Sequence, residues 1–191
     1  VSEDGRYLFV YMAKGADSRN RLYVADLGDP KAPNVTAAPV PVVEEDDGEF
    51  AVIGNVGSTL YVSTDLGAPR RKVVAISLAE RARSKWRTIL PEGAHTIENV
   101  HLTKTHLVVT RLVDVRGELS LYTLDGKGAG KVSLPGIGTA QVATPRVGGE
   151  TFVSFVSFVT PPRILRVDLK AKKAAEPSAS VAVWDQVAGE A

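Results

Sequence analysis

The sequence predicts an all-β protein, namely part of a β-propeller with about four blades of four antiparallel strands. One pattern of paired strands recurs four times, and the first strands of the pairs begin at residues 7, 59, 106 and 151. The resulting spacings of 52, 47 and 45 residues match the period of propeller blades, which are small sheets of short strands. Helix signals are nearly absent: only residues 78–86 could form a turn or two of helix, and a charged loop is the other interpretation of that segment.

The expected strands are dominated by Val, Tyr, Thr and Ile that alternate with polar or small residues, as a pleated ribbon requires. The four pairs are 7–13 with 21–27, 59–65 with 72–78, 106–112 with 118–124, and 151–157 with 163–169. The other strands precede the pairs at 49–55, 96–102 and 139–144, or follow them at 39–45, 85–91, 130–135 and 181–187. The first blade lacks its innermost strand because the chain opens at a turn. We therefore expect blades at approximately 1–45, 49–91, 96–135 and 139–187.

An open sector of a propeller leaves two apolar blade flanks bare, because only a closed ring buries them. Four blades can close into a small ring, but the more economical interpretation is that further blades lie outside this chain. The chain begins with Val rather than Met, and we interpret it as a piece of a longer protein. The isolated piece is expected to self-associate or to be marginally stable.

The composition is that of an ordinary globular protein and excludes several function classes. Of the 191 residues, 44% are hydrophobic, and 23 basic residues against 22 acidic ones give a net charge of +1. This balance argues against nucleic acid or an anionic membrane as a partner. The chain has no cysteine, which excludes disulfides, thiolate nucleophiles and zinc-thiolate sites.

No motif in the chain predicts catalysis, a metal or a cofactor. The pattern G-x-S-x-G is absent, and its nearest approach, around Ser58, lies in a turn with no helix after it. Residues 125–133 are glycine-rich but lack the spacing of a phosphate loop, so we expect a hairpin there. The acidic run 44–49 lacks the alternating ligands of a calcium loop and is interpreted as a solvated loop. The three histidines have no metal-binding spacing; they are His95, His101 and His106.

The loops between the second and third strands of the blades are the most informative segments. They span residues 13–21, 65–71, 113–118 and 158–163, and alternating strand directions bring them to one face of the propeller. Every loop contains or ends in arginine: Arg21, Arg70, Arg71, Arg116 and Arg163. These are either polar turns with salt-bridged arginines, or a positive rim that faces a ligand, a partner or a second domain.

The same loops carry a resemblance that covers nearly the whole chain. The segment VSEDGRYLFVYMAKGADSRNRLYVADL, the hairpin YVSTDLGAPRRKVVAISL and the segment FVSFVTPPRILRVDL resemble the propeller domain of prolyl oligopeptidase, in that family's order and spacing. The Ala68-Pro69 pair and the pattern of residues 157–161 favour the prolyl branch over related oligopeptidases.

The resemblance implies a seven-bladed propeller above an α/β-hydrolase domain that carries a Ser, Asp and His triad. In such a protein the propeller restricts access, so that short proline-containing peptides reach the site and are cut after proline. The hydrolase domain would lie outside this chain and be its partner, and the chain alone would be inactive.

The resemblance also implies one candidate site, the loop of Lys14, Gly15, Ala16 and Asp17, which matches a family loop that reaches into the substrate cavity. Two alternatives remain for the whole chain: a non-catalytic propeller that serves as an interaction scaffold, and the propeller of a related oligopeptidase with another specificity. We expect a cytoplasmic protein, with the periplasm as the alternative.

Overall fold

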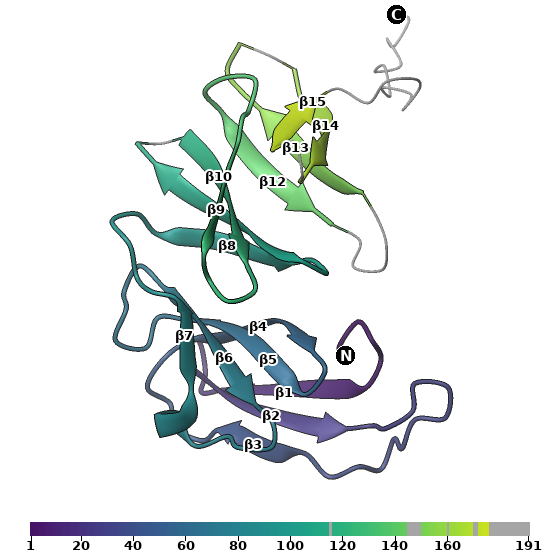
Figure 1. Cartoon of the computed structure of the whole chain (residues 1–191). Helices are drawn as coiled ribbons and strands as arrows, with labels where there is room; N and C mark the ends of the chain where they lie inside the picture. The colour runs from purple at the N-terminus through teal and green to yellow at the C-terminus, as the bar shows by residue number, and fades with distance from the viewer. Residues whose placement is uncertain (115, 145–149, 160, 170–171, 176–191) are drawn as a thin grey trace, which may run out of the picture.

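The computed structural model describes residues 1–114, 116–144, 150–159, 161–169 and 172–175. In these ranges the chain forms four antiparallel sheets that follow one another along the sequence (Figure 1). The first sheet has three strands and the other three have four each. This arrangement confirms the predicted all-β fold of a partial β-propeller, and we refer to the sheets as the first to fourth blades.

The strands of each blade are neighbours in sequence order, so each connection within a blade is a hairpin. The first blade contains β1 (Tyr7–Ala13), β2 (Asn20–Asp26) and β3 (Val40–Val43), and the second contains β4 (Phe50–Val56), β5 (Thr59–Thr64), β6 (Lys72–Ser77) and β7 (Arg87–Leu90). The third contains β8 (Ile97–Leu102), β9 (His106–Val113), β10 (Arg116–Thr123) and β11 (Gly128–Val132). The fourth contains β12 (Thr139–Ala143), β13 (Thr151–Val156), β14 (Arg163–Asp168) and β15 (Lys173–Ala175).

One segment differs from the sequence-based expectation, and a second agrees with it. The strand that pairs with β14 is Lys173–Ala175, whereas we expected the fourth strand of this blade at residues 181–187, which lie outside the described residues. Residues 78–86 form a loop that contains a single turn of 3₁₀ helix, η1 (Arg83–Lys85). The described residues include no helix long and apolar enough to cross a membrane.

Hydrophobic clusters fill the three spaces between successive blades. Strand β6 contributes to two of them, because Val74 and Ile76 face the first blade while Val73 and Ala75 face the third. A third cluster joins the third and fourth blades. Each fully buried Val, Leu or Ile contributes about 1.5–3 kcal/mol. Burial on both faces is the reason that β6 is a nearly continuous apolar run rather than a strict alternation.

The glycine-rich segment 125–133 is the hairpin that the sequence predicts, since it joins β10 to β11. Gly126 has φ +87°, and a Cβ at this position would lie 2.0 Å from the carbonyl oxygen of Ile89 in the second blade. The Tyr61 hydroxyl donates to the Leu124 carbonyl at 3.2 Å in the same hairpin. The hairpin therefore packs against the neighbouring blade, and only glycine fits at its closest approach.

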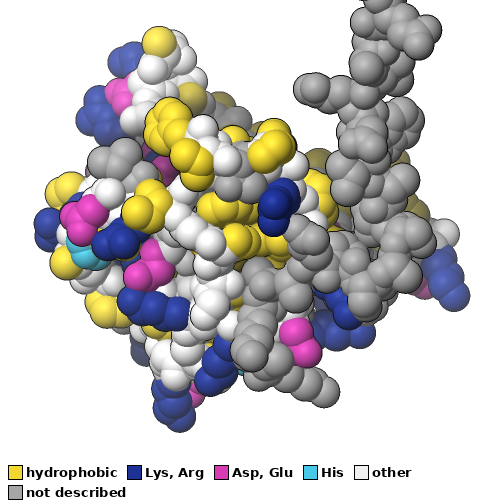
Figure 2. All heavy atoms as spheres, turned by 90° about the horizontal axis from the view of Figure 1, so that it is seen from above, with side chains coloured by type: hydrophobic (Ala, Val, Ile, Leu, Met, Phe, Trp, Pro, Cys, Tyr) yellow, Lys and Arg dark blue, Asp and Glu magenta, His cyan; other side chains and the backbone are white. Residues whose placement is uncertain are grey.

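The outer faces of the first and fourth blades carry exposed apolar side chains. Val156 and Ile164 on the fourth blade are 43% and 50% exposed, and Met12 on the first blade is 53% exposed. Figure 2 views the molecule from the end that carries the fourth blade and shows hydrophobic side chains gathered there. Among the described residues no further blade covers these two faces.

Candidate functional site

One face of the propeller sector carries the hairpins β1–β2, β5–β6, β9–β10 and β13–β14, together with the linkers between blades. We name this the loop face. A backbone hydrogen bond ties each of the first three hairpins to the next blade or to the linker before it: from Asn20 N to Gly48 O at 3.1 Å, from Ile97 N to Arg70 O at 3.0 Å, and from Gly117 N to Gly138 O at 2.9 Å. The loop face is therefore a connected rim rather than a set of independent loops.

The predicted substrate-cavity loop, Lys14 to Asp17, lies in the β1–β2 hairpin of the loop face. Lys14, Gly15 and Ala16 are exposed, and Gly15 adopts φ +64°, a left-handed conformation that favours glycine. Asp17 accepts hydrogen bonds from the backbone and guanidinium of Arg19, at 3.0 and 2.9 Å, and these bonds lower the pKa of Asp17 to about 2. The Asp17 carboxylate is thus already paired within its own loop.

Asn20 fixes the base of this loop, and the sequence analysis did not identify it. Its Nδ2 donates to the carbonyl of Phe50 at 3.1 Å, and the Phe50 amide donates to its Oδ1 at 2.8 Å. The side chain therefore mimics one rung of a β-ladder between the first and second blades. Asn20 is 7% exposed, but nothing in the sequence distinguishes this polar residue at a strand end from a solvated one.

The acidic run 44–49 is a loop that joins the first and second blades, and most of its carboxylates accept hydrogen bonds from arginines. Asp46 accepts two hydrogen bonds from Arg21 of the first blade, at 2.9 and 2.7 Å, and Glu49 accepts one from Arg71 of the second blade at 2.7 Å. Arg83 of the second blade binds both Glu45 and Asp47. The hydrogen bonds from Arg21 and Arg83 lower the pKa values of Asp46 and Asp47 respectively. The run is thus a largely exposed loop, as the sequence predicts, and arginines from both adjoining blades hold it as well.

The other predicted rim arginines lie at different places on the loop face. Arg70 forms an ion pair with Glu92 at 3.3 Å, and its backbone amide donates to the same carboxylate at 2.7 Å. Arg116 lies 3.9 Å from Asp114, and Arg163 is exposed at the start of β14. The predicted arginines Arg21, Arg70, Arg71 and Arg116 thus pair with carboxylates of this chain.

A shallow depression of about 240 Å³ lies beside the substrate-cavity loop. Its lining includes Met12, Lys14 and the paired side chains of Arg21 and Asp46. It combines an apolar wall with charges of both signs at the base of the β1–β2 hairpin. A bound chain that reached this loop could touch both the apolar and the charged side chains of the depression.

The histidines of the third-blade region do not form a common site. Burial lowers the pKa of His101, whose Nε2 has no hydrogen-bond partner, and Nδ1 of His106 lies 2.8 Å from the Thr105 hydroxyl. Within the residues that the structure describes, no three His, Asp or Glu side chains are grouped as metal ligands.

The sheets and the loop face together define a sector of a β-propeller. The chain belongs to the prolyl oligopeptidase family, since the family model described as "Prolyl oligopeptidase, N-terminal beta-propeller domain" matches residues 1–178. This membership confirms the resemblance drawn from the sequence.

Similar proteins include the dual function macrocyclase-peptidase POPB of Amanita bisporigera, with 31% identity over 90% of this chain and 23% of that protein. The prolyl endopeptidase of Elizabethkingia miricola is 27% identical over 91% of this chain and 24% of its own length. Among solved structures, a prolyl endopeptidase superposes with a TM-score of 0.81 at 29% identity, covering 93% of this chain and 26% of that one. Prolyl oligopeptidase B from Galerina marginata superposes with a TM-score of 0.79 at 29% identity, over 88% of this chain and 24% of its own. The chain thus spans about a quarter of the length of these relatives.

Proposed function

We propose that this chain is the access-limiting propeller portion of a serine peptidase that cuts short peptides after proline. Catalysis would reside in an α/β-hydrolase domain of the same protein, which would be the partner of the loop face. The proposal is supported by membership of the prolyl oligopeptidase family and by relatives named as prolyl endopeptidases. On this proposal the chain alone hydrolyses nothing, because the catalytic Ser, Asp and His would belong to the hydrolase domain.

The observation that carries the proposal is that hydrogen bonds to the second blade fix the base of the exposed β1–β2 loop. Lys14, Gly15 and Ala16 face solvent, while Asn20 at the base of the loop is hydrogen-bonded to both backbone groups of Phe50. A filter must hold its opening at a fixed size, because a loose rim would also admit bulky chains. The ties between neighbouring blades on the loop face meet this requirement.

The test compares substrates of different length in the whole protein that contains this chain. One short peptide and one long unfolded chain would share the same Ala-Pro cleavage sequence, and their kcat/KM values would be measured with the unaltered protein and with Asn20→Ala. We expect a strong preference for the short peptide, and we expect Asn20→Ala to reduce this preference by loosening the rim. Asn34→Ala, in the exposed β2–β3 loop, is the matched control and should leave the preference unchanged.

Other outcomes would identify the alternatives. A whole protein that cleaves no proline peptide would favour a non-catalytic scaffold, and cleavage after Arg or Lys would favour a related oligopeptidase of different specificity. Equal cleavage of short and long substrates, with proline specificity retained, would contradict the access-limiting role of the propeller. It would leave the assignment as a proline-specific peptidase unchanged.

A further inference from the structure

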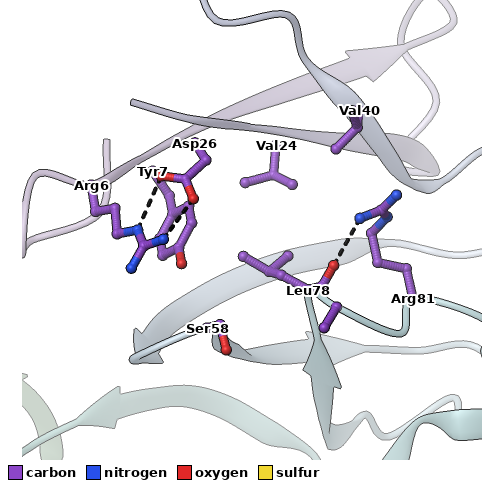
Figure 3. Close-up of a pocket in the computed structure, with 9 residues that line it drawn as sticks. Arg6, Tyr7, Val24, Asp26, Val40, Ser58, Leu78 and Arg81 are labelled. Carbon is purple, nitrogen blue, oxygen red and sulfur yellow. Dashed lines mark hydrogen bonds and ion pairs between the residues drawn. The ribbon is translucent and has the colours of Figure 1, made fainter. Parts of the chain in front are cut away.

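A cavity of about 260 Å³ lies between the first and second blades, at the strand ends opposite the loop face (Figure 3). Tyr7 at the start of β1, Asp26 at the end of β2 and Ser58 in the β4–β5 turn all line it. These positions are the far ends of strands whose other ends carry the loop face. The cavity is therefore separate from the candidate site described above.

The middle of the cavity is apolar. Val24, Val40 and Leu78 come from three different segments and point toward the same space in Figure 3. Tyr7 and Val24 are almost fully buried, at 2% and 3% exposure, so they form a fixed floor. Such walls favour a compact apolar group over water.

The two ends of the cavity differ in charge. At one end Arg6 donates two hydrogen bonds to the carboxylate of Asp26, at 3.0 and 2.8 Å, so the positive charge of Arg6 is balanced there. At the other end the Arg81 guanidinium donates to the Leu78 carbonyl at 2.7 Å, and no ion pair joins Arg81 to a carboxylate of the described residues. A guanidinium has five N–H donors, so Arg81 retains donors and an unbalanced positive charge.

We propose that this cavity binds a small monocarboxylate with a compact apolar body. Its carboxylate would accept charge-assisted hydrogen bonds from Arg81, which suits a planar anion of this kind. Its apolar part would lie between Val24, Val40 and Leu78. The chemistry has two sources, a free short-chain acid and the carboxyl end of a peptide with an apolar last residue.

Saturation-transfer NMR titrations on the whole protein test the proposal with three probes: hexanoate, N-acetyl-alanyl-proline and the amide of that dipeptide. We expect at least one acid to bind, and we expect the uncharged amide to lose the signal. Arg81→Gln, which removes the charge but keeps an amide N–H donor, should weaken binding by about tenfold. Ala79→Leu should weaken it by filling the cavity with Arg81 intact, while Arg87→Gln, an exposed arginine outside the cavity, should bind as the unaltered protein does.

The outcomes distinguish a free acid from a peptide end, and they also show whether the proposal itself fails. Stronger binding of hexanoate assigns a free acid, and stronger binding of the dipeptide acid assigns a peptide end. If neither acid binds, or if Arg81→Gln binds both acids as well as the unaltered protein, the proposal is wrong. Only the binding that Arg81→Gln and Ala79→Leu both weaken is assigned to this cavity. Binding of the dipeptide acid at a proline-specific active site would persist in these variants, so failure of this proposal is distinguishable from failure of the proposed function.

Discussion

At the scale of single residues, a few side chains fix how neighbouring blades meet. Asn20 satisfies a buried N–H and a buried C=O of Phe50 that lie in another blade. Removal of such a partner costs more than a hydrogen bond gains, because the groups left behind are buried without a partner. Positions of this kind are therefore the most sensitive ones outside the hydrophobic clusters.

Asn20→Ala is expected to lower the free energy of unfolding by about 2–3 kcal/mol, since it leaves both Phe50 backbone groups unsatisfied. Urea unfolding of the variant measures the change, and hydrogen exchange of the Phe50 amide should become faster. Asn34→Ala in the exposed β2–β3 loop serves as the control. A loss no larger than that of the control would show that the Asn20 bonds contribute little.

Arg71 combines an ion pair to Glu49 with a left-handed backbone, φ 68°. Arg71→Ala removes the ion pair and keeps the unfavourable conformation, whereas Arg71→Gly removes both. We therefore expect the glycine variant to be the more stable of the two by about 1 kcal/mol. Urea unfolding of the pair measures the difference, and an alanine variant that is more stable than the glycine variant would contradict the expectation.

At the scale of elements, the linker 44–49 is held by charge. Hydrogen bonds from Arg21 and Arg83 lower the pKa values of Asp46 and Asp47 below those of the unfolded chain. A lowered pKa in the folded state contributes stability that is present above the unfolded pKa, about 3.9, and is lost as the pH falls through the folded pKa. The two carboxylates should therefore make the protein less stable as the pH falls below about 5.

This prediction is tested by urea unfolding at a series of acidic pH values. The unfolding free energy should fall with pH, and the double variant Asp46→Asn and Asp47→Asn should show a shallower fall. Added salt should weaken the same contribution, because these groups are exposed and screened. An identical pH slope in the double variant would show that other carboxylates dominate.

The elements differ in how much of their structure could be predicted from the sequence. Strands such as β5 and β6 were predictable because β-branched residues and turn signals mark their bounds locally. The arginine contacts of residues 44–49 were not predictable, because Arg83 lies 36 positions from Asp47 and only the stacking of blades brings them together. The loop of Lys14–Asp17 was found through the family resemblance, whereas Asn20 and the cavity at Arg81 required the three-dimensional arrangement.

At the scale of the whole molecule, the two outer blade faces determine how the isolated chain behaves. Val156 and Ile164 are exposed on the fourth blade, and Met12 is exposed on the first. The corresponding faces of the inner blades are covered by their neighbours. Apolar surface of this kind drives association when no neighbour covers it.

We therefore expect the isolated chain to self-associate, and we expect Val156→Ser with Ile164→Ser to shift it toward monomer. Sedimentation equilibrium over a range of concentrations measures the apparent mass of both proteins. Val35→Ser is the matched control, because Val35 is 81% exposed but lies in the β2–β3 loop rather than on a strand of the fourth blade. A chain that stays monomeric at every concentration would show that the exposed flanks are too small or too polar to associate, whereas equal association of the double variant and the control would place the contact elsewhere. If the double variant alone becomes monomeric, the fourth-blade face is the surface on which a further blade would pack in a complete ring.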